Sequence, residues 1–120
     1  MATFALHPQL AADGLLLADW PLTRVLRMND AAYPWLILVP RLTDAREIID
    51  LSAADRVRLM DEIAWASQAV KDLQRPDKIN VGALGNMVPQ LHVHVIARFR
   101  TDAAWPKPVC GVAPPRAYGR

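Results

Sequence analysis

The sequence predicts an α+β fold, in which an antiparallel sheet of about five strands carries one long helix packed on one face. Two observations lead to this fold class. Three strand-like runs precede a single long amphipathic stretch, and two more strand-like runs follow it. A short helical piece is expected near the N-terminus, between turns at His7-Pro8 and Asp13-Gly14. At 120 residues, the chain is expected to form a single domain over 1–120.

The first three strands are expected at residues 15–20, 22–28 and 35–40. Residues 35–40 are apolar at nearly every position, which is typical of a central strand buried on both faces. The last two strands are expected at residues 78–84 and 90–100, joined by a turn at residues 85–89 that contains Gly85 and Pro89.

The long helix is predicted near residues 53–74. Ser52 is in position to cap its N-terminus, with Asp55 three residues later, and Pro76 is expected to end it. Apolar residues recur at steps of three to four, and we expect this stripe to face the core: Val57, Met60, Ile63, Ala64, Val70 and Leu73. The remaining positions are expected to face solvent: Arg56, Arg58, Asp61, Glu62 and Lys71.

Composition excludes several classes of protein. The chain is 52% hydrophobic and 22% charged, close to the average for a globular domain. Its net charge of +2 is too small and too scattered for nucleic-acid binding, although it suits a small anionic ligand. Cys110 is the only cysteine, which excludes an intramolecular disulfide.

No signal sequence or bilayer-length apolar run is visible, so no membrane association and a cytoplasmic location are expected. The proline-rich tail from about residue 105, which includes Pro114 and Pro115, is expected to be extended and to run over the surface.

The last predicted strand carries the candidate chemistry. Because side chains alternate along a strand, Leu91, Val93, Val95, Ala97 and Phe99 form an apolar face that is expected to pack on the helix. The other face carries Gln90, His92, His94 and Arg98, interrupted only by Ile96.

Successive members of the polar row stand roughly 7 Å apart, so two imidazoles can flank one phosphate group. A structural role for the pair and a metal site are the alternatives. A stable zinc site, however, needs three or four protein ligands, and no third histidine, second cysteine or carboxylate is evident on this face. We therefore predict no metal.

The turn before this strand is suited to anion binding. Gly85 can adopt a positive φ, and the backbone N–H groups of Gly85, Asn86 and Met87 could form a concave nest for a phosphate. An ordinary turn glycine is an equally simple reading of the same residues.

At this strand the sequence resembles the histidine triad family of nucleotide hydrolases and transferases, whose signature is His-φ-His-φ-His-φ-φ with φ apolar. The chain reads Gln-Leu-His-Val-His-Val-Ile over residues 90–96, so the second and third histidines match. The context also matches, with Asn80 and a glycine-containing turn upstream, a Val-Pro-Arg ending at Arg41, and Trp105-Pro106 downstream. The resemblance spans about residues 25–111 and implies a HIT-like fold.

The resemblance implies a mechanism in which His92 attacks the α-phosphate and forms a nucleotidyl-histidine intermediate that water cleaves. His94 would bond the phosphate and help the leaving group depart. Asp30 would contact the ribose, although a plain turn aspartate is as good a reading. The other implied substrate-binding residues are Asn80, Gly85, Asn86, Met87 and Trp105.

Three positions depart from the family pattern. Gln90 replaces the first histidine, so its amide could orient the nucleophile but could not relay a proton. Met87 stands where many members have serine, and Trp35 lies near a position where another histidine is common. These changes indicate a divergent branch that retains the nucleophile.

The leading hypothesis is therefore a hydrolase or transferase that acts on a nucleoside monophosphate conjugate, such as a phosphoramidate, an acyl derivative or a dinucleoside polyphosphate. No cofactor is implied, and by resemblance the protein would be a homodimer. The alternatives are a nucleotide-binding module with little catalysis and, less favoured, a metal-binding His-x-His protein.

Overall fold

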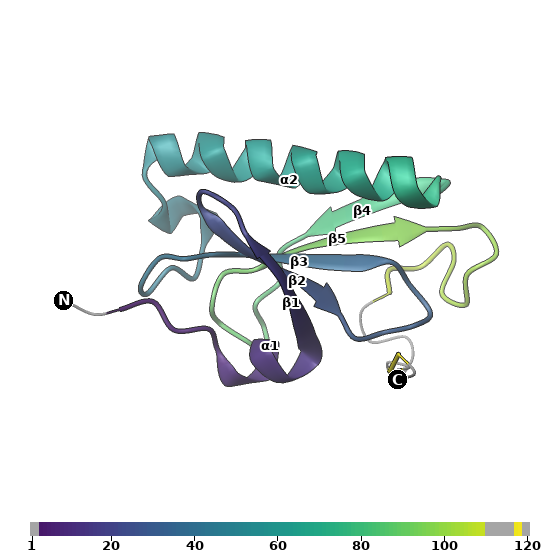
Figure 1. Ribbon diagram of the computed structural model, residues 1–120, viewed down its shortest axis with the longest axis horizontal. Helices are drawn as coiled ribbons and strands as arrows, with labels where there is room; N and C mark the ends of the chain where they lie inside the picture. Colours follow the sequence, from purple (N-terminus) through teal and green to yellow (C-terminus); the bar gives the residue numbers. More distant parts are fainter. Residues whose placement is uncertain (1–2, 110–116, 119–120) are drawn as a thin grey trace.

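The computed structural model describes residues 3–109 and 117–118. The five strands form one antiparallel sheet with the order β1-β2-β3-β5-β4 (Figure 1). The predicted α+β class, the five strands, the long helix and the short N-terminal helix are confirmed. The elements in chain order are α1 (Pro8–Asp13), β1 (Gly14–Asp19), β2 (Thr23–Met28), β3 (Trp35–Pro40), the 3-10 turn η1 (Ile48–Asp50), α2 (Ala53–Gln74), β4 (Lys78–Gly82) and β5 (Val93–Arg98).

Strand β3 is central, as its apolar sequence predicts, because it pairs with β2 on one side and β5 on the other. The last two strands are shorter than predicted. β4 ends at Gly82, and β5 begins at Val93 rather than at residue 90. Gln90 and His92 therefore lie on the loop that enters the sheet, not in a hydrogen-bonded strand.

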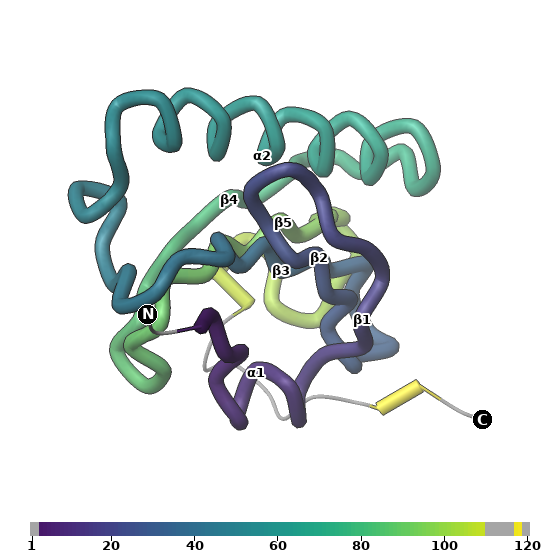
Figure 2. Tube along the Cα trace, turned by 60° about the vertical axis from the view of Figure 1, so that its left-hand side comes forward, coloured from purple at the N-terminus to yellow at the C-terminus, as the bar shows by residue number. Residues whose placement is uncertain are grey.

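The two faces of the sheet are covered by different elements. Helix α2 lies along one face, while α1 lies on the opposite side (Figures 1 and 2). The apolar alternation of β5 is confirmed, because Val93, Val95 and Ala97 are buried in the core beneath α2. A second core lies on the other face, where Leu10 of α1 joins other buried residues, namely Leu26, Trp35, Ile37, Val39 and Ile96.

The predicted core stripe of α2 is wrong at four of its six positions. Val57, Met60 and Leu73 are 64%, 63% and 80% exposed, and Ala64 is also exposed. The residues that face the sheet are Leu59, Glu62, Ile63, Ala66 and Val70. Apolar residues surround much of this helix, so the sequence pattern did not define a single face.

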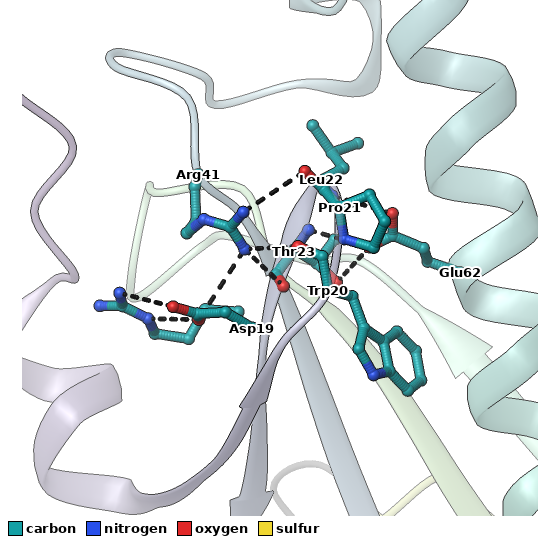
Figure 3. A network of polar contacts seen from close by, with 8 residues as sticks. Asp19, Trp20, Pro21, Leu22, Thr23, Arg41 and Glu62 are labelled. Carbon is teal, nitrogen blue, oxygen red and sulfur yellow. Dashed lines mark hydrogen bonds and ion pairs between the residues drawn. The ribbon is translucent and has the colours of Figure 1, made fainter.

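Glu62 was expected in solvent but is fully buried, with 0% exposure. Its carboxylate accepts hydrogen bonds from the backbone N–H groups of Leu22 and Thr23 and from the Thr23 hydroxyl, at 2.9, 2.9 and 2.7 Å (Figure 3). On the other side of the β1–β2 turn, the Arg41 guanidinium donates hydrogen bonds to the carbonyls of Trp20 and Thr23. The buried carboxylate thus fastens the β1–β2 turn to α2.

The ends of α2 follow the sequence signals. The Ser52 hydroxyl accepts a hydrogen bond from the Asp55 N–H at 3.1 Å, as the capping pattern predicts. The helix ends at Gln74, and Arg75 turns the chain with a left-handed φ of 49° immediately before Pro76.

The segment after β5 is more embedded than predicted. Lys107 and Pro108 are exposed, but Val109 is only 8% exposed and packs into the second core. Cys110 and the Pro114-Pro115 pair lie outside the described residues. Within residues 3–109 and 117–118, none of the helices is long and apolar enough to cross a membrane.

Candidate active site

The two histidines lie together on the face of the sheet opposite α2. His94 is on β5 and pairs in register with Ile37 of β3, a residue of the second core. His92 enters from the loop before β5 and is 6% exposed. The ring centroids are 4.9 Å apart with an interplanar angle of 79°. The predicted pairing of the imidazoles is present, and the rings are closer than the spacing of alternate residues along a strand.

The hydrogen bond of His92 defines which ring nitrogen can react. Its Nδ1 lies 2.6 Å from the backbone carbonyl oxygen of Gln90. A carbonyl oxygen only accepts hydrogen bonds, so Nδ1 must carry the proton. In the neutral ring, Nε2 then holds the lone pair and is the nucleophilic atom.

His94 is held in the opposite tautomer by a different partner. The Trp35 indole N–H donates to His94 Nδ1 at 2.9 Å. Because an indole nitrogen is a donor only, Nδ1 is unprotonated and Nε2 carries the hydrogen. Burial, together with the neighbouring His92, lowers the pKa of His94 to about 4. His94 is therefore neutral at pH 7 and presents an N–H group.

Gln90 serves this site through its backbone and not through its amide. Its side-chain oxygen accepts from the His7 N–H at 2.8 Å, and its amide nitrogen donates to the Ala5 carbonyl at 2.9 Å. These bonds attach the N-terminal segment to the loop before β5, and the two segments lie near each other in Figure 2. The expected amide contact with His92 is absent among the described contacts, because the Gln90 carbonyl makes it.

A buried cluster around Arg98 adjoins the histidines and was not foreseen from the sequence. Arg98 is 2% exposed and pairs with Asp102 through Nε and Nη2 at 2.8 and 3.1 Å. It also donates to the Asn80 side-chain oxygen and to the Lys107 carbonyl, each at 2.8 Å. Asp102 four residues after Arg98 was the available signal, since the spacing suits a local ion pair.

The Arg98 ion pair is firmly ionised. The hydrogen bond from Arg98 lowers the pKa of Asp102 to about 2. Burial acts in the opposite direction, and the backbone N–H groups of Phe99 and Trp105 lower this pKa further. The Asn80 oxygen is occupied by Arg98, so only the amide N–H₂ group of Asn80 remains to meet a phosphate oxygen. This cluster fixes Asn80 relative to the segment after β5.

Two cavities open beside the histidines. One of about 540 Å³ is bordered by His94, Asn80, Gly82 and Pro106. The other, of about 220 Å³, is bordered by His92 and Gly85. A ligand whose phosphate lies between the imidazoles could therefore extend into either space.

The predicted turn residues differ in whether they border a cavity. Gly85 has a φ of 78°, as the nest requires, and borders the His92 cavity. Asn86 and Met87 are exposed, and Met87 reaches 93%. Their side chains point away from the core, so the backbone N–H groups are what this turn offers to an anion.

Trp105 and Asp30 are outside the linings of the two cavities. The Trp105 ring lies 5.6 Å from the Arg98 guanidinium carbon, so it contacts the site through that cluster. Asp30 is 4% exposed, and its carboxylate accepts from the Ala32 N–H in the β2–β3 turn. The ribose contact of Asp30 stays a prediction.

Within the part of the chain that the structure describes, no group of three or more histidine, cysteine, aspartate or glutamate residues is arranged to hold a metal ion.

The HIT domain family model matches residues 10–101. The chain therefore belongs to the HIT domain family.

Solved structures share the whole fold. A histidine triad protein from Bradyrhizobium japonicum has a TM-score of 0.96 at 52% identity, and the match covers 98% of this chain and 88% of that chain. Another, from Marinobacter aquaeolei VT8, has a TM-score of 0.96 at 48% identity over 98% of this chain and 86% of that chain.

Curated relatives are two AP-4-A phosphorylases from strains of Mycobacterium tuberculosis, each 33% identical over 106 residues. The aligned region covers 80% of this chain and 53% of each relative, so the chain spans about half the length of these proteins.

Proposed function

We propose that this protein is a nucleotidyl hydrolase or transferase that cleaves a bond at the α-phosphate of a nucleoside monophosphate conjugate. The observation that carries the proposal is the pair of oppositely bonded imidazoles. His92 presents a lone pair at Nε2, and His94 presents an N–H donor beside it. A nucleophile and a phosphate-binding donor are the two groups that this reaction requires.

In the proposed first step, His92 Nε2 attacks phosphorus. The Nε2–P bond forms while the bond from phosphorus to the leaving group breaks, and the electron pair departs with that group. The adduct carries a positive charge on the ring, which the Gln90 carbonyl stabilises at Nδ1–H. Water, which loses a proton to solvent, or inorganic phosphate then attacks phosphorus, and the electron pair of the N–P bond returns to Nε2.

His94 is assigned the role of hydrogen-bond donor. Its pKa of about 4 keeps it neutral, so transfer of the Nε2 proton would leave an unfavourable anionic ring. The Nε2–H group instead stabilises negative charge on a phosphate oxygen without giving up its proton.

This assignment favours leaving groups that depart as stable anions. A polyphosphate needs no proton at neutral pH, whereas an amine leaving group does. We therefore propose dinucleoside polyphosphates as better substrates than phosphoramidates. The name of the AP-4-A phosphorylase relatives supports this choice, which stays a proposal because those proteins are about twice as long.

The test is turnover of a dinucleoside polyphosphate and of adenosine phosphoramidate by the wild type and by His92→Ala. We expect wild-type turnover of the polyphosphate, with loss of about a thousandfold or more in the variant, because no other group replaces the nucleophile. Mass spectrometry of denatured protein after brief reaction should detect a nucleotidyl adduct that His92→Ala lacks.

The second candidate is a nucleotide-binding module with little catalysis. Replacement of the first triad histidine by Gln90, whose side chain is committed to the N-terminal segment, favours it. Nucleotide binding without wild-type turnover of a broad substrate panel would establish this candidate and reject the enzyme.

We also propose that the protein is a homodimer in the cytoplasm. In the structure, β4 is an edge strand with Val81 50% exposed, and Met60 on α2 is 63% exposed. An edge strand and exposed apolar side chains of this kind are suited to association of two copies. Light scattering should give the mass of a dimer at micromolar concentration, and the mass of a monomer would contradict the proposal.

A further inference from the structure

A third cavity, of about 690 Å³, lies between the C-terminal half of α2 and strands β1 to β3. It is larger than the two cavities beside the histidines and falls within the usual range for small-molecule sites. Its border includes Arg27 and Leu36, which pair across β2 and β3. The next residue on β3, Ile37, pairs with His94, and neighbouring side chains on a strand point to opposite faces. Most of the cavity wall and the histidines are therefore on opposite faces of the sheet, and Trp35, whose indole N–H bonds to His94, also borders the cavity.

The walls of this cavity are mainly apolar. Leu17 and Leu73 border it while remaining 53% and 80% exposed, so large apolar side chains at its rim are left in contact with solvent. Trp20, Leu36 and Val70 supply more of the apolar surface. Such a surface favours the apolar part of a ligand, because binding removes both from water.

Arg27 supplies the cavity's charge and has an unused donor. Its Nε is buried and has no hydrogen-bond partner among the described residues. The guanidinium carbon lies 4.0 Å from the ring centroid of Tyr118, which also borders the cavity. No acidic residue is part of the described lining. By contrast, Arg24 and Arg98 are each paired with an aspartate.

A buried donor without an acceptor is unfavourable, and an anionic group is the partner that a guanidinium binds best. A carboxylate or sulfonate can accept hydrogen bonds from the Arg27 guanidinium at the cavity border, while its apolar body lies against the leucines. We propose that this cavity binds a small amphipathic anion, with its charged head on Arg27 and its apolar body between α2 and the sheet. This site is separate from the one in the proposed function and does not depend on it.

The test is fluorescence titration with 1-anilinonaphthalene-8-sulfonate, an apolar probe with a single negative charge, followed by displacement with decanoate. We expect saturable binding of one probe per chain. Arg27→Leu should weaken binding about tenfold or more, since it removes a charge-assisted hydrogen bond. Ala69→Phe, which fills the cavity from α2, should also abolish binding.

Arg24→Leu is the matched control. It removes the same charge from the same strand, but Arg24 faces the other side of the sheet and pairs with Asp19. We expect it to bind the probe as the wild type does. Circular dichroism and urea unfolding of all three variants show whether they keep the fold, and Ala69→Phe tests the site without altering Arg27.

Three outcomes would overturn the proposal. The first is non-saturating fluorescence that is equal in Arg27→Leu and the wild type, which means that the probe only coats the surface. The second is displacement of the probe by adenosine monophosphate with no effect of Arg27→Leu, which assigns the signal to the histidine face. The third is that the wild type does not bind the probe and Arg27→Leu changes the sedimentation coefficient, which would mean that this face is a contact between two copies of the chain.

Discussion

Trp35→Phe is the most informative substitution in the candidate active site, because it removes one donor and keeps an aromatic ring. The indole N–H is the described partner of His94 Nδ1, at 2.9 Å. Without it, Nδ1 is a buried acceptor with no partner, which costs about 1–3 kcal/mol of stability. The ring can then recover by moving its proton to Nδ1, but this removes the donor at Nε2. We expect kcat/KM for the proposed reaction to fall about tenfold, equivalent to about 1.4 kcal/mol of transition-state stabilisation.

The tautomer can be measured independently of turnover by ¹H–¹⁵N NMR of the imidazole nitrogens at pH 7. In the wild type, His94 should show protonated Nε2 and unprotonated Nδ1, and Trp35→Phe should show a mixture. Trp35→His, which restores a ring N–H, should recover part of both the tautomer and the rate. Trp65→Phe is the control, because Trp65 is 45% exposed on α2. An unchanged His94 tautomer and unchanged kcat/KM in Trp35→Phe would refute the role of Trp35.

Three further predictions concern stability. The folded pKa of His94, about 4, lies below the unfolded value of 6.5, so its contribution is complete above pH 6.5 and is lost as the pH falls toward 4. Urea unfolding should show up to about 3 kcal/mol of this loss, and His94→Asn should flatten the dependence. Glu62→Ala should lower the free energy of unfolding in urea by about 3 kcal/mol or more, because it leaves two buried backbone N–H groups unpaired. Asp61→Ala, at an exposed position, is the control and should lower it little. Equal effects of the two substitutions would contradict the buried role of Glu62. Arg98→Lys should lower the free energy of unfolding by about 2–4 kcal/mol and raise KM, because lysine cannot reproduce the hydrogen bonds to both Asp102 and Asn80. An unchanged KM would show that this cluster does not act on substrate binding.

The sequence was sufficient for the element order and for the histidine pair. Strong local signals located these features: the Ser52 cap and Pro76 bounded α2, and alternation placed Val93, Val95 and Ala97 under it. Each signal depends on a few neighbouring residues, so it can be read without knowledge of the tertiary structure.

Two contacts of the structure were missed because the partner residue is distant in sequence. Glu62 resembles a solvent-facing helical charge until the β1–β2 turn, about forty positions earlier, brings two N–H groups to it. Trp35 looks like an ordinary core aromatic residue until β3 pairs with β5 and sets its indole against His94, 59 positions later. No periodicity within either segment reports such a contact.

Gln90 shows why a departure from a family pattern need not alter the chemistry at the neighbouring position. The residue that replaces the first histidine uses its side chain to hold Ala5 and His7, while its carbonyl orients His92. Any residue supplies a carbonyl at that point in the backbone, so the tautomer of His92 does not depend on which side chain stands at 90. What the substitution removes is a titratable group beside the nucleophile. Together with a neutral His94, this leaves the described part of the site with a nucleophile and a hydrogen-bond donor but without a proton donor for an amine. The preference proposed for anionic leaving groups follows from that combination.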